Sequence, residues 1–179
     1  SPDLTVLGSS TPSIYNDCEL SGKIKKAVPH TFTVMVGVHV SAVPKETLAN
    51  AIDSLDAVAI HEYDETLVDL ASRLSNGPLS DEVLSTVKGI AFVNSKKEII
   101  RNTDRPYMEN LDDLPMVSSV YKKHLNINPY FYGHSRHPIV VLVTGRGCPF
   151  HCTYCVVPQT LQGHKYRKRS VDSIVEEFL

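Results

Sequence analysis

The first 77 residues alternate short apolar segments with amphipathic stretches, and this alternation limits the possible folds more than any other feature of the chain. Each apolar segment has the length of a strand and is followed by a polar turn, after which apolar residues recur at helical spacing. Such alternation predicts an α/β fold with a parallel sheet and helices on its faces. The predicted buried strands cover residues 3–8, 32–36 and 56–60, and the predicted helices begin near Ile14, Pro44 and Leu67.

The three polar turns are predicted to form one rim of this sheet. In an open parallel sheet, ligands bind beyond the carboxyl ends of the strands, which is where these turns lie. The hydroxyl groups of the first turn could bind such a ligand, but Ser and Thr before a helix are also common caps, and we favour capping slightly. Since only three strand–helix units are present, we expect further strands upstream and interpret the chain as a fragment. The predicted rim consists of residues 9–13, 37–41 and 61–65.

Two carboxylates, Glu62 and Asp64, lie in the third turn. They could act as an acid–base pair in catalysis. However, carboxylates at the start of a helix are already explained by their attraction to the helix dipole. We therefore favour the structural role for both.

The pattern changes after Gly77-Pro78. Residues 89–93 and 98–101 flank a polar tip and predict a β-hairpin. The next stretch, 102–138, has four prolines and little periodicity, which indicates an ordered linker docked by its aromatic residues 130–132. The apolar run 139–143 predicts the first strand of a second domain. The predicted organisation is a partial Rossmann-like domain at 1–77, a hairpin and linker at 78–138, and the start of another domain at 139–179, ending in a helix opened by Ser170.

Composition and charge exclude some classes of protein. The formal net charge of −2 gives the whole molecule no attraction to nucleic acid, and we interpret the basic run 164–169 as a solvated loop. No apolar run approaches the ~20 residues that span a bilayer. Three of the four cysteines lie within eight residues, which favours metal binding in a reducing compartment, so we expect the cytoplasm. The distant Cys18 is expected to be a small core residue.

The cysteine motif has the spacing C-x3-C-x2-C and comprises Cys148, Cys152 and Cys155. A loop of this length can direct three thiolates at three irons of one small cluster. Iron–sulfur clusters ordinarily take four cysteines, so the lack of a fourth nearby cysteine predicts one iron that is open to an exchangeable ligand. Gly145 and Gly147 allow the backbone to approach closely.

Other metal or redox sites remain open at this point. Zinc could use the three thiolates with His151 or His164, giving a non-enzymatic interaction module stabilised by zinc. Cys152 and Cys155 could form a redox pair of the thioredoxin type, but that interpretation leaves Cys148 without a role. We favour the open iron–sulfur cluster over both.

Residues 146–155, Arg-Gly-Cys-Pro-Phe-His-Cys-Thr-Tyr-Cys, resemble the signature of the radical S-adenosylmethionine superfamily. The resemblance implies a [4Fe-4S] cluster on the three cysteines, with S-adenosylmethionine chelated by the open iron and cleaved to a 5′-deoxyadenosyl radical. It also implies an external electron donor, such as a flavodoxin or a ferredoxin, and a (β/α) barrel that begins at residue 139. Tyr154 would lie against the adenine of S-adenosylmethionine, and Arg169 would reach its carboxylate.

The upstream repeat resembles the cobalamin-binding domain that precedes the barrel in one branch of this superfamily. The similarity lies in the turns 11–17, 37–42 and 62–66 and in the linker motif 111–115. The chain departs from that pattern at Val38 and His61, where the branch usually has glycine, and it lacks the Asp-x-His-x-x-Gly motif of a protein ligand to cobalt. The resemblance implies cobalamin contacts from Ser9, Ser10, Thr11, Gly37, His39, Glu62 and Tyr63.

Residues 158–170 are similar to enzymes associated with hopanoid biosynthesis and, more loosely, to the anaerobic porphyrin cyclase group. The resemblance implies cobalamin-assisted methylation, cyclisation or rearrangement of a lipid or polycyclic small molecule. A methylthiotransferase acting on RNA or protein is the alternative enzyme. That class needs three further cysteines in the upstream domain, and this chain has only Cys18 there.

Overall fold

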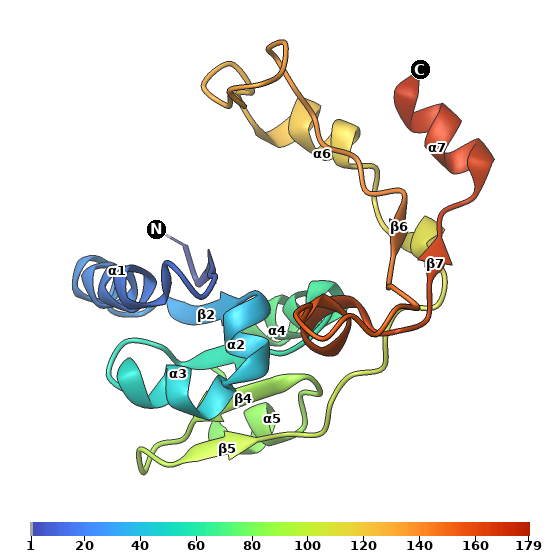
Figure 1. The fold of residues 1–179 in the computed structure, drawn as a ribbon. Helices are drawn as coiled ribbons and strands as arrows, with labels where there is room; N and C mark the ends of the chain where they lie inside the picture. The colour runs from blue at the N-terminus through green and yellow to red at the C-terminus, as the bar shows by residue number, and fades with distance from the viewer. Residues whose placement is uncertain (1) are drawn as a thin grey trace. The chain divides into compact units, whose positions relative to one another are not determined.

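The computed structural model describes residues 2–179, which form two compact units (Figure 1). The first, here called the sheet unit, contains the residues up to Tyr107 together with Cys148–His164. The second unit contains Met108–Gly147 and Lys165–Leu179. The segment that carries the three cysteines is therefore part of the sheet unit, although it follows the linker in sequence.

A five-stranded sheet forms the centre of the sheet unit. The strands lie in chain order, and the first three are parallel, which confirms the predicted α/β class. The fourth strand is antiparallel to the third, and the fifth is antiparallel to the fourth. The strands are β1 (Leu4–Gly8), β2 (Phe32–Val36), β3 (Ala57–Ala59), β4 (Ile90–Val93) and β5 (Ile99–Arg101).

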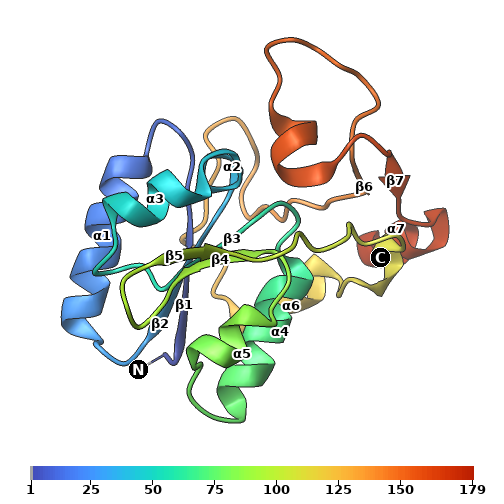
Figure 2. The same cartoon turned by 90° about the horizontal axis from the view of Figure 1, so that it is seen from below.

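Helices cover both faces of this sheet (Figure 2). One face packs against α1 (Ile14–Ala27) and α3 (Pro44–Asn50), and the other against α4 (Asp64–Ser75) and α5 (Asp81–Ser85). Successive residues of the inner strands belong to opposite cores, because strand side chains alternate between the two faces. Thus Met35 lies in one core and its neighbours Val34 and Val36 lie in the other.

Two details of the predicted strand–helix repeat are wrong. Of the predicted residues 3–8, Leu4–Gly8 form β1, but this strand pairs only with β2 among the described residues, so it is an outer strand and Val6 is 41% exposed. The second rim turn, 37–41, is mostly helical, since α2 spans Val38–Ala42. The apolar periodicity of the sequence cannot distinguish an edge strand from an inner one, because that depends on which strands lie beside it.

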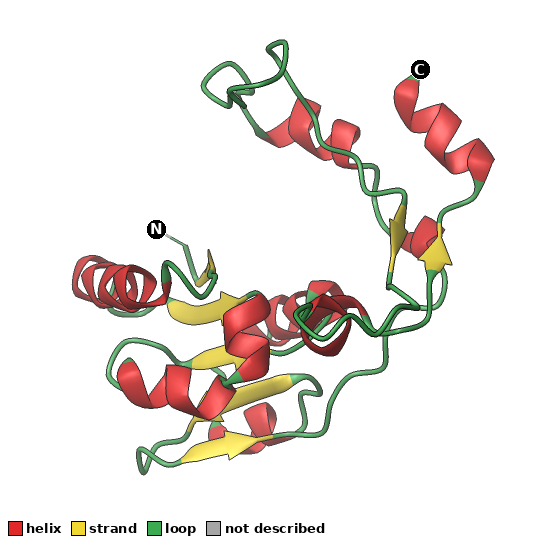
Figure 3. Cartoon of the chain, in the orientation of Figure 1, coloured by secondary structure: helices red, strands yellow, loops and turns green. Residues whose placement is uncertain are grey.

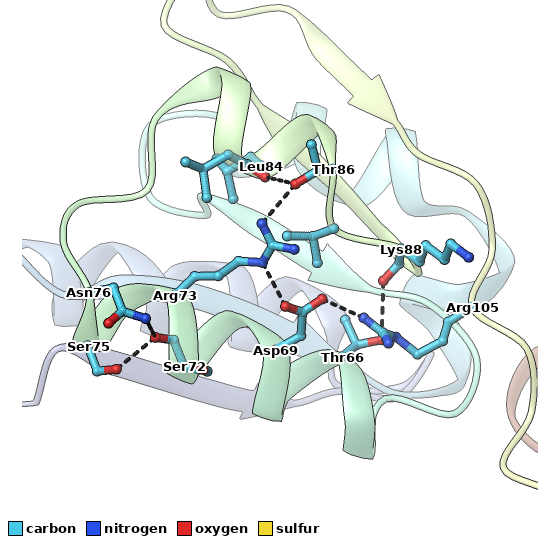
Figure 4. A network of polar contacts seen from close by, with 12 residues as sticks. Thr66, Asp69, Ser72, Arg73, Ser75, Asn76, Leu84, Thr86, Lys88 and Arg105 are labelled. Carbon is cyan, nitrogen blue, oxygen red and sulfur yellow. Dashed lines mark hydrogen bonds and ion pairs between the residues drawn. The ribbon is translucent and has the colours of Figure 1, made fainter.

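The predicted hairpin is present and extends the sheet, since β4 pairs with β3. The predicted boundary after residue 77 therefore falls inside the sheet unit. A polar network on α4 then holds the chain that leaves β5 (Figure 4). Asp69 accepts hydrogen bonds from Arg73 (2.6 Å) and Arg105 (2.7 Å). Desolvation raises the pKa of the Asp69 carboxyl, but these two guanidinium groups outweigh it, and the net shift is downward.

The second unit has short elements and long irregular stretches. Its elements are a 3-10 turn, η1 (Leu111–Asp113), helices α6 (Val117–His124) and α7 (Val171–Phe178), and a small antiparallel pair, β6 (Gly145–Arg146) and β7 (Arg167–Lys168). Ser170 caps α7 as predicted, because its hydroxyl accepts a hydrogen bond from the N–H of Ser173. Residues 125–144 contain neither helix nor strand (Figure 3).

Three expectations for the second unit are wrong. The run 139–143 is not a strand, since no other described segment pairs with it. The barrel expected to begin at residue 139 stays a prediction. The aromatic residues 130–132 do not dock the linker, because they are 52–76% exposed. The linker also contains α6, whose short apolar pattern was missed. Separately, none of the helices in residues 2–179 has the length and apolar character needed to cross a bilayer.

Candidate functional site

The first two rim turns pack tightly on one another. The backbone N–H of Ser9 donates to the carbonyl oxygen of Val36 (2.8 Å), which continues the β1–β2 pairing into the turn. Gly37 follows at φ +125°, and a Cβ at this position would lie 2.1 Å from the carbonyl oxygen of Ser9. Only glycine fits this backbone conformation and this close approach. Gly37 is therefore required by the contact between the two turns.

The hydroxyls of the first turn do not cap α1. Ser13 occupies the cap position, but its hydroxyl donates to the Asp17 carboxylate (2.7 Å) and also contacts Ser10 (3.0 Å). The expected capping role of Ser9, Ser10 and Thr11 is therefore wrong. Ser9 Oγ is buried and makes no hydrogen bond to any described residue. A buried hydroxyl without a partner costs free energy, so this atom suits a ligand that supplies a hydrogen bond.

Thr11 and His39 connect the first turn to the second. Thr11 Oγ1 lies 3.2 Å from His39 Nδ1, and the His39 ring is half-buried. These groups and Ser9 Oγ offer hydrogen-bonding partners at the carboxyl ends of β1 and β2. This part of the rim fits the polar portion of a large cofactor such as cobalamin.

The third turn is built differently. His61 has φ +65°, and its N–H donates to Ser41 Oγ (3.0 Å). Tyr63 packs against the core beneath α4, and Glu62 is half-buried beside it. The packing of Tyr63 gives it a structural role, so the predicted cobalamin residues of this turn are not gathered in the same way as those of the first two turns.

The cysteine segment, residues 148–164, packs onto the rest of the sheet unit through η2 (Pro158–Gln162). This π-helical turn contacts α2. The carbonyl oxygen of Thr160 lies 3.3 Å from His61 Nδ1. Gly163 has φ +69°, and a Cβ there would lie 2.8 Å from Tyr107 Cε2, so the Tyr107 ring lies directly against the Gly163 backbone. The segment with the three thiols is thus attached beside the predicted rim.

The three thiols lie on an irregular loop within this segment. Cys148 and Cys155 are half-buried and Cys152 is exposed, and the N–H of Cys155 donates to the Cys152 carbonyl oxygen (3.1 Å). Within residues 2–179, no three His, Cys, Asp or Glu side chains lie close enough together to hold a metal ion. The donor set still fits an iron–sulfur cluster by its chemistry, because free thiols on an accessible loop are its ordinary ligands.

The two residues predicted to contact S-adenosylmethionine differ in their surroundings. Tyr154 is 87% exposed on the cysteine loop. Arg169 is buried in the second unit, where it pairs with Glu177 and donates to Ser173 Oγ (2.8 Å). The structure therefore engages the Arg169 guanidinium within its own unit and does not present it to a cofactor.

Three residues that attach the cysteine segment were not predicted as functional from the sequence: Tyr107, Thr160 and Gly163. His61 was predicted as part of the rim and as a departure from a glycine pattern, but not as a contact of this segment. Since His61 and Tyr107 lie far from the cysteine segment along the chain, no local spacing brings these residues together. The one available signal was a bulky residue where a tight turn favours glycine.

Comparison with known proteins gives sequence relatives along almost the whole chain, although no family model matches it. A methyltransferase of Pyrococcus horikoshii, itself uncharacterized, is 30% identical over 99% of this chain and 36% of its own length. This relative and the two that follow are named as enzymes. An anaerobic magnesium-protoporphyrin IX monomethyl ester cyclase of Cereibacter sphaeroides is 27% identical over 99% of this chain and 28% of its own length. A cytidylyl-2-hydroxyethylphosphonate methyltransferase of Streptomyces wedmorensis is 29% identical over 84% and 32%, respectively. The chain spans about a third of the length of these curated relatives.

Comparison with solved structures shows that the fold is also shared with a known protein. The cobalamin-dependent S-adenosylmethionine radical enzyme OxsB, solved with aqua-cobalamin bound, superposes with a TM-score of 0.67 at 19% sequence identity. The match covers 98% of this chain and 23% of OxsB. A second OxsB structure, with S-adenosylmethionine also bound, gives a TM-score of 0.66. The mixed α/β fold with its parallel strands is therefore shared with OxsB.

Proposed function

We propose that this chain belongs to a cobalamin-dependent radical S-adenosylmethionine enzyme that transfers a methyl group. The observation that carries the proposal is the packing of the C-x3-C-x2-C segment onto the sheet unit, beside the carboxyl ends of the parallel strands. Homology along nearly the whole chain to two enzymes named as methyltransferases supports the reaction class.

In this proposal, Cys148, Cys152 and Cys155 hold a [4Fe-4S] cluster, and the polar residues of the first two turns hold cobalamin. The cluster would supply the electron that cleaves S-adenosylmethionine, and cobalamin would carry the methyl group. Cys148 and Cys155 are half-buried, and the exposed Tyr154 is available to stack on the adenine ring. The rim residues are Ser9, Thr11, Gly37 and His39, with Ser10 and Glu62 at their margin.

The substrate class and the partners are also part of the proposal. A lipid or a polycyclic small molecule is proposed from the sequence resemblance, and cyclisation or rearrangement is the alternative reaction, supported by the relative named as a cyclase. A small redox protein such as a flavodoxin or a ferredoxin would deliver electrons. We place the protein in the cytoplasm because exposed thiols such as Cys152 persist in a reducing compartment.

Anaerobic reconstitution of the full chain with iron and sulfide tests the proposal. We expect a brown protein absorbing near ~400 nm, with about four irons per chain. Replacing any one of Cys148, Cys152 or Cys155 by alanine should remove most of the iron. Cys18→Ala is the matched control, because Cys18 packs against the core on α1 and should have no effect on iron content.

Two results would contradict the proposal. A colourless protein with stoichiometric zinc would favour the interaction module, and retention of full iron content by all three single variants would exclude the cysteines as ligands. Methyl transfer is tested separately, by supplying labelled S-adenosylmethionine and aqua-cobalamin to the intact enzyme and following the labelled methyl group.

A further inference from the structure

The turn after β3 contains an unusual backbone conformation. His61 lies in the left-handed region at φ +65°, where glycine has no steric cost and other residues do. Among the described residues, the one other non-glycine residue with positive φ is Lys97, at the tip of the β4–β5 hairpin. A histidine held in this conformation indicates that its side chain makes compensating contacts.

Both ring nitrogens of His61 face oxygen atoms. Nδ1 lies 3.3 Å from the Thr160 carbonyl oxygen in η2, and Nε2 lies 3.4 Å from Asp104 Oδ2 in the segment after β5. A carbonyl oxygen only accepts hydrogen bonds, so Nδ1 must carry the proton in its contact with Thr160. The His61 side chain therefore joins the end of β3 to two segments that lie far from it in sequence.

Aromatic packing completes this arrangement. The rings of His61 and Tyr107 have centroids 5.9 Å apart at an interplanar angle of 51°. Tyr107 also lies against the backbone of Gly163, whose carbonyl oxygen accepts a hydrogen bond from the N–H of Cys148 (3.1 Å). The hydrogen bond between Cys148 and Gly163 therefore joins the two ends of the cysteine loop. The Gly163 end packs against Tyr107, whose ring in turn packs against His61.

We propose that His61 is a positioning residue for the cysteine segment. Its imidazole holds η2 against the sheet and, through Tyr107 and Gly163, fixes where Cys148 begins the loop of three thiols. The contacts with Thr160 and Tyr107 are properties of the iron-free chain. Only the consequence for iron binding rests on the proposed function.

Hydrogen–deuterium exchange of the iron-free full chain tests the docking. In His61→Gly the turn keeps its backbone conformation without strain while the ring is lost. We expect exchange at residues 156–163 to become about three- to tenfold faster, as the loss of one hydrogen bond and its packing implies. Exchange in β2 and β3 should stay unchanged, which shows that the sheet is folded.

Two further variants separate docking from general strain. His61→Asn tolerates positive φ and keeps a hydrogen-bonding group near Nδ1, so it should restore most of the protection at residues 156–163. Lys97→Gly relieves a similar backbone conformation (φ +62°) but does not contact the cysteine segment, so it should leave that protection unchanged. Equal exchange at 156–163 in His61→Gly and the unmodified chain would overturn the proposal.

Iron retention provides the functional measurement. After reconstitution, a chelator should remove iron about three- to tenfold faster from His61→Gly than from the unmodified protein, with His61→Asn in between. Equal rates of iron loss, together with faster exchange, would contradict the link between docking and the thiols. Failure of the unmodified chain to take up iron would contradict the proposed function, while the exchange result would still decide whether His61 docks η2.

Discussion

In the sheet unit, apolar side chains fill both faces of a sheet, whereas the second unit is held mainly by polar contacts. Among the apolar residues that the structure shows as buried, all but Leu111 belong to the sheet unit. In the second unit, Arg167 donates to the Met108 carbonyl oxygen, the N–H of Ser170 donates to Asp112 (3.0 Å), and Arg169 pairs with Glu177. We therefore expect the stability of the sheet unit to depend mainly on its apolar core and that of the second unit mainly on its polar contacts.

The same difference bears on the candidate site. The rim turns and the cysteine segment belong to the unit with the apolar core, so their positions depend on a sheet that resists local opening. Two of the polar contacts of the second unit, those to Asp112 and Glu177, involve carboxylates, so their strength depends on pH. Three measurements test whether the two units respond differently.

The largest effect is expected from Phe92→Ala. Phe92 on β4 is 2% exposed and packs among the residues beneath α4 and α5. Removing the ring should destabilise the sheet unit by about 3–5 kcal/mol, as for other buried aromatic residues. Exchange in β2 and β3 should accelerate strongly, while exchange in α7 changes little. The matched control, Val68→Ala on the exposed side of α4, should change stability by less than ~0.5 kcal/mol.

A smaller effect is expected at the rim from Gly37→Ala. The added Cβ would meet the Ser9 carbonyl oxygen at a backbone conformation unsuited to alanine, so we expect a loss of about 1–3 kcal/mol. Chemical denaturation followed by circular dichroism measures this loss. Gly22→Ala is the control: within α1 it has open space around it and should stabilise the chain by about 0.5–1 kcal/mol. Equal behaviour of the two variants would show that the first two turns do not pack as described.

The smallest effect is expected from lowering the pH, and in the second unit it should be seen at the Arg169–Glu177 pair. Desolvation raises the pKa of the Glu177 carboxyl, but hydrogen bonds from Arg169 and from the N–H of Ser118 lower it more, so its pKa in the folded state lies below the ordinary 4.5. The stabilisation is therefore complete above pH 4.5 and is lost as the pH falls through the lowered value. The neutral acid still accepts hydrogen bonds, which limits the effect to about 1 kcal/mol.

Exchange in α7 between pH 6 and pH 3, corrected for the intrinsic rate, measures this loss. Glu177→Gln is the control, because it resembles the protonated acid and should show the low-pH behaviour at every pH. A sheet unit that loosens before α7 as the pH falls would contradict the comparison of the two units.

The sequence predicted the strand–helix repeat, the hairpin and the cap of α7 well, because each is specified by local periodicity or by a capping residue. It predicted the wrong burial for β1 and a strand at 139–143. Both errors have one cause. A strand forms and is buried only where other strands pair with it, and an apolar run in the sequence does not show which strands those are. The predicted docking of the aromatic residues 130–132 was wrong for a similar reason, since apolar side chains are buried only where another segment provides a surface to pack against.

Some features of the candidate site could likewise be predicted from the sequence, and others could not. Cys148, Cys152 and Cys155 stand out from their spacing alone, because three thiols within eight residues lie on one short loop. The contacts of that loop with the sheet involve His61, Tyr107 and Gly163, which come from three separate parts of the chain. Most helices and strands of the sheet unit and the thiol loop could thus be predicted from the amino acids, since these features depend on nearby residues. The position of that loop could be seen only in the folded chain, because it results from packing between segments whose separation along the chain leaves no periodic pattern.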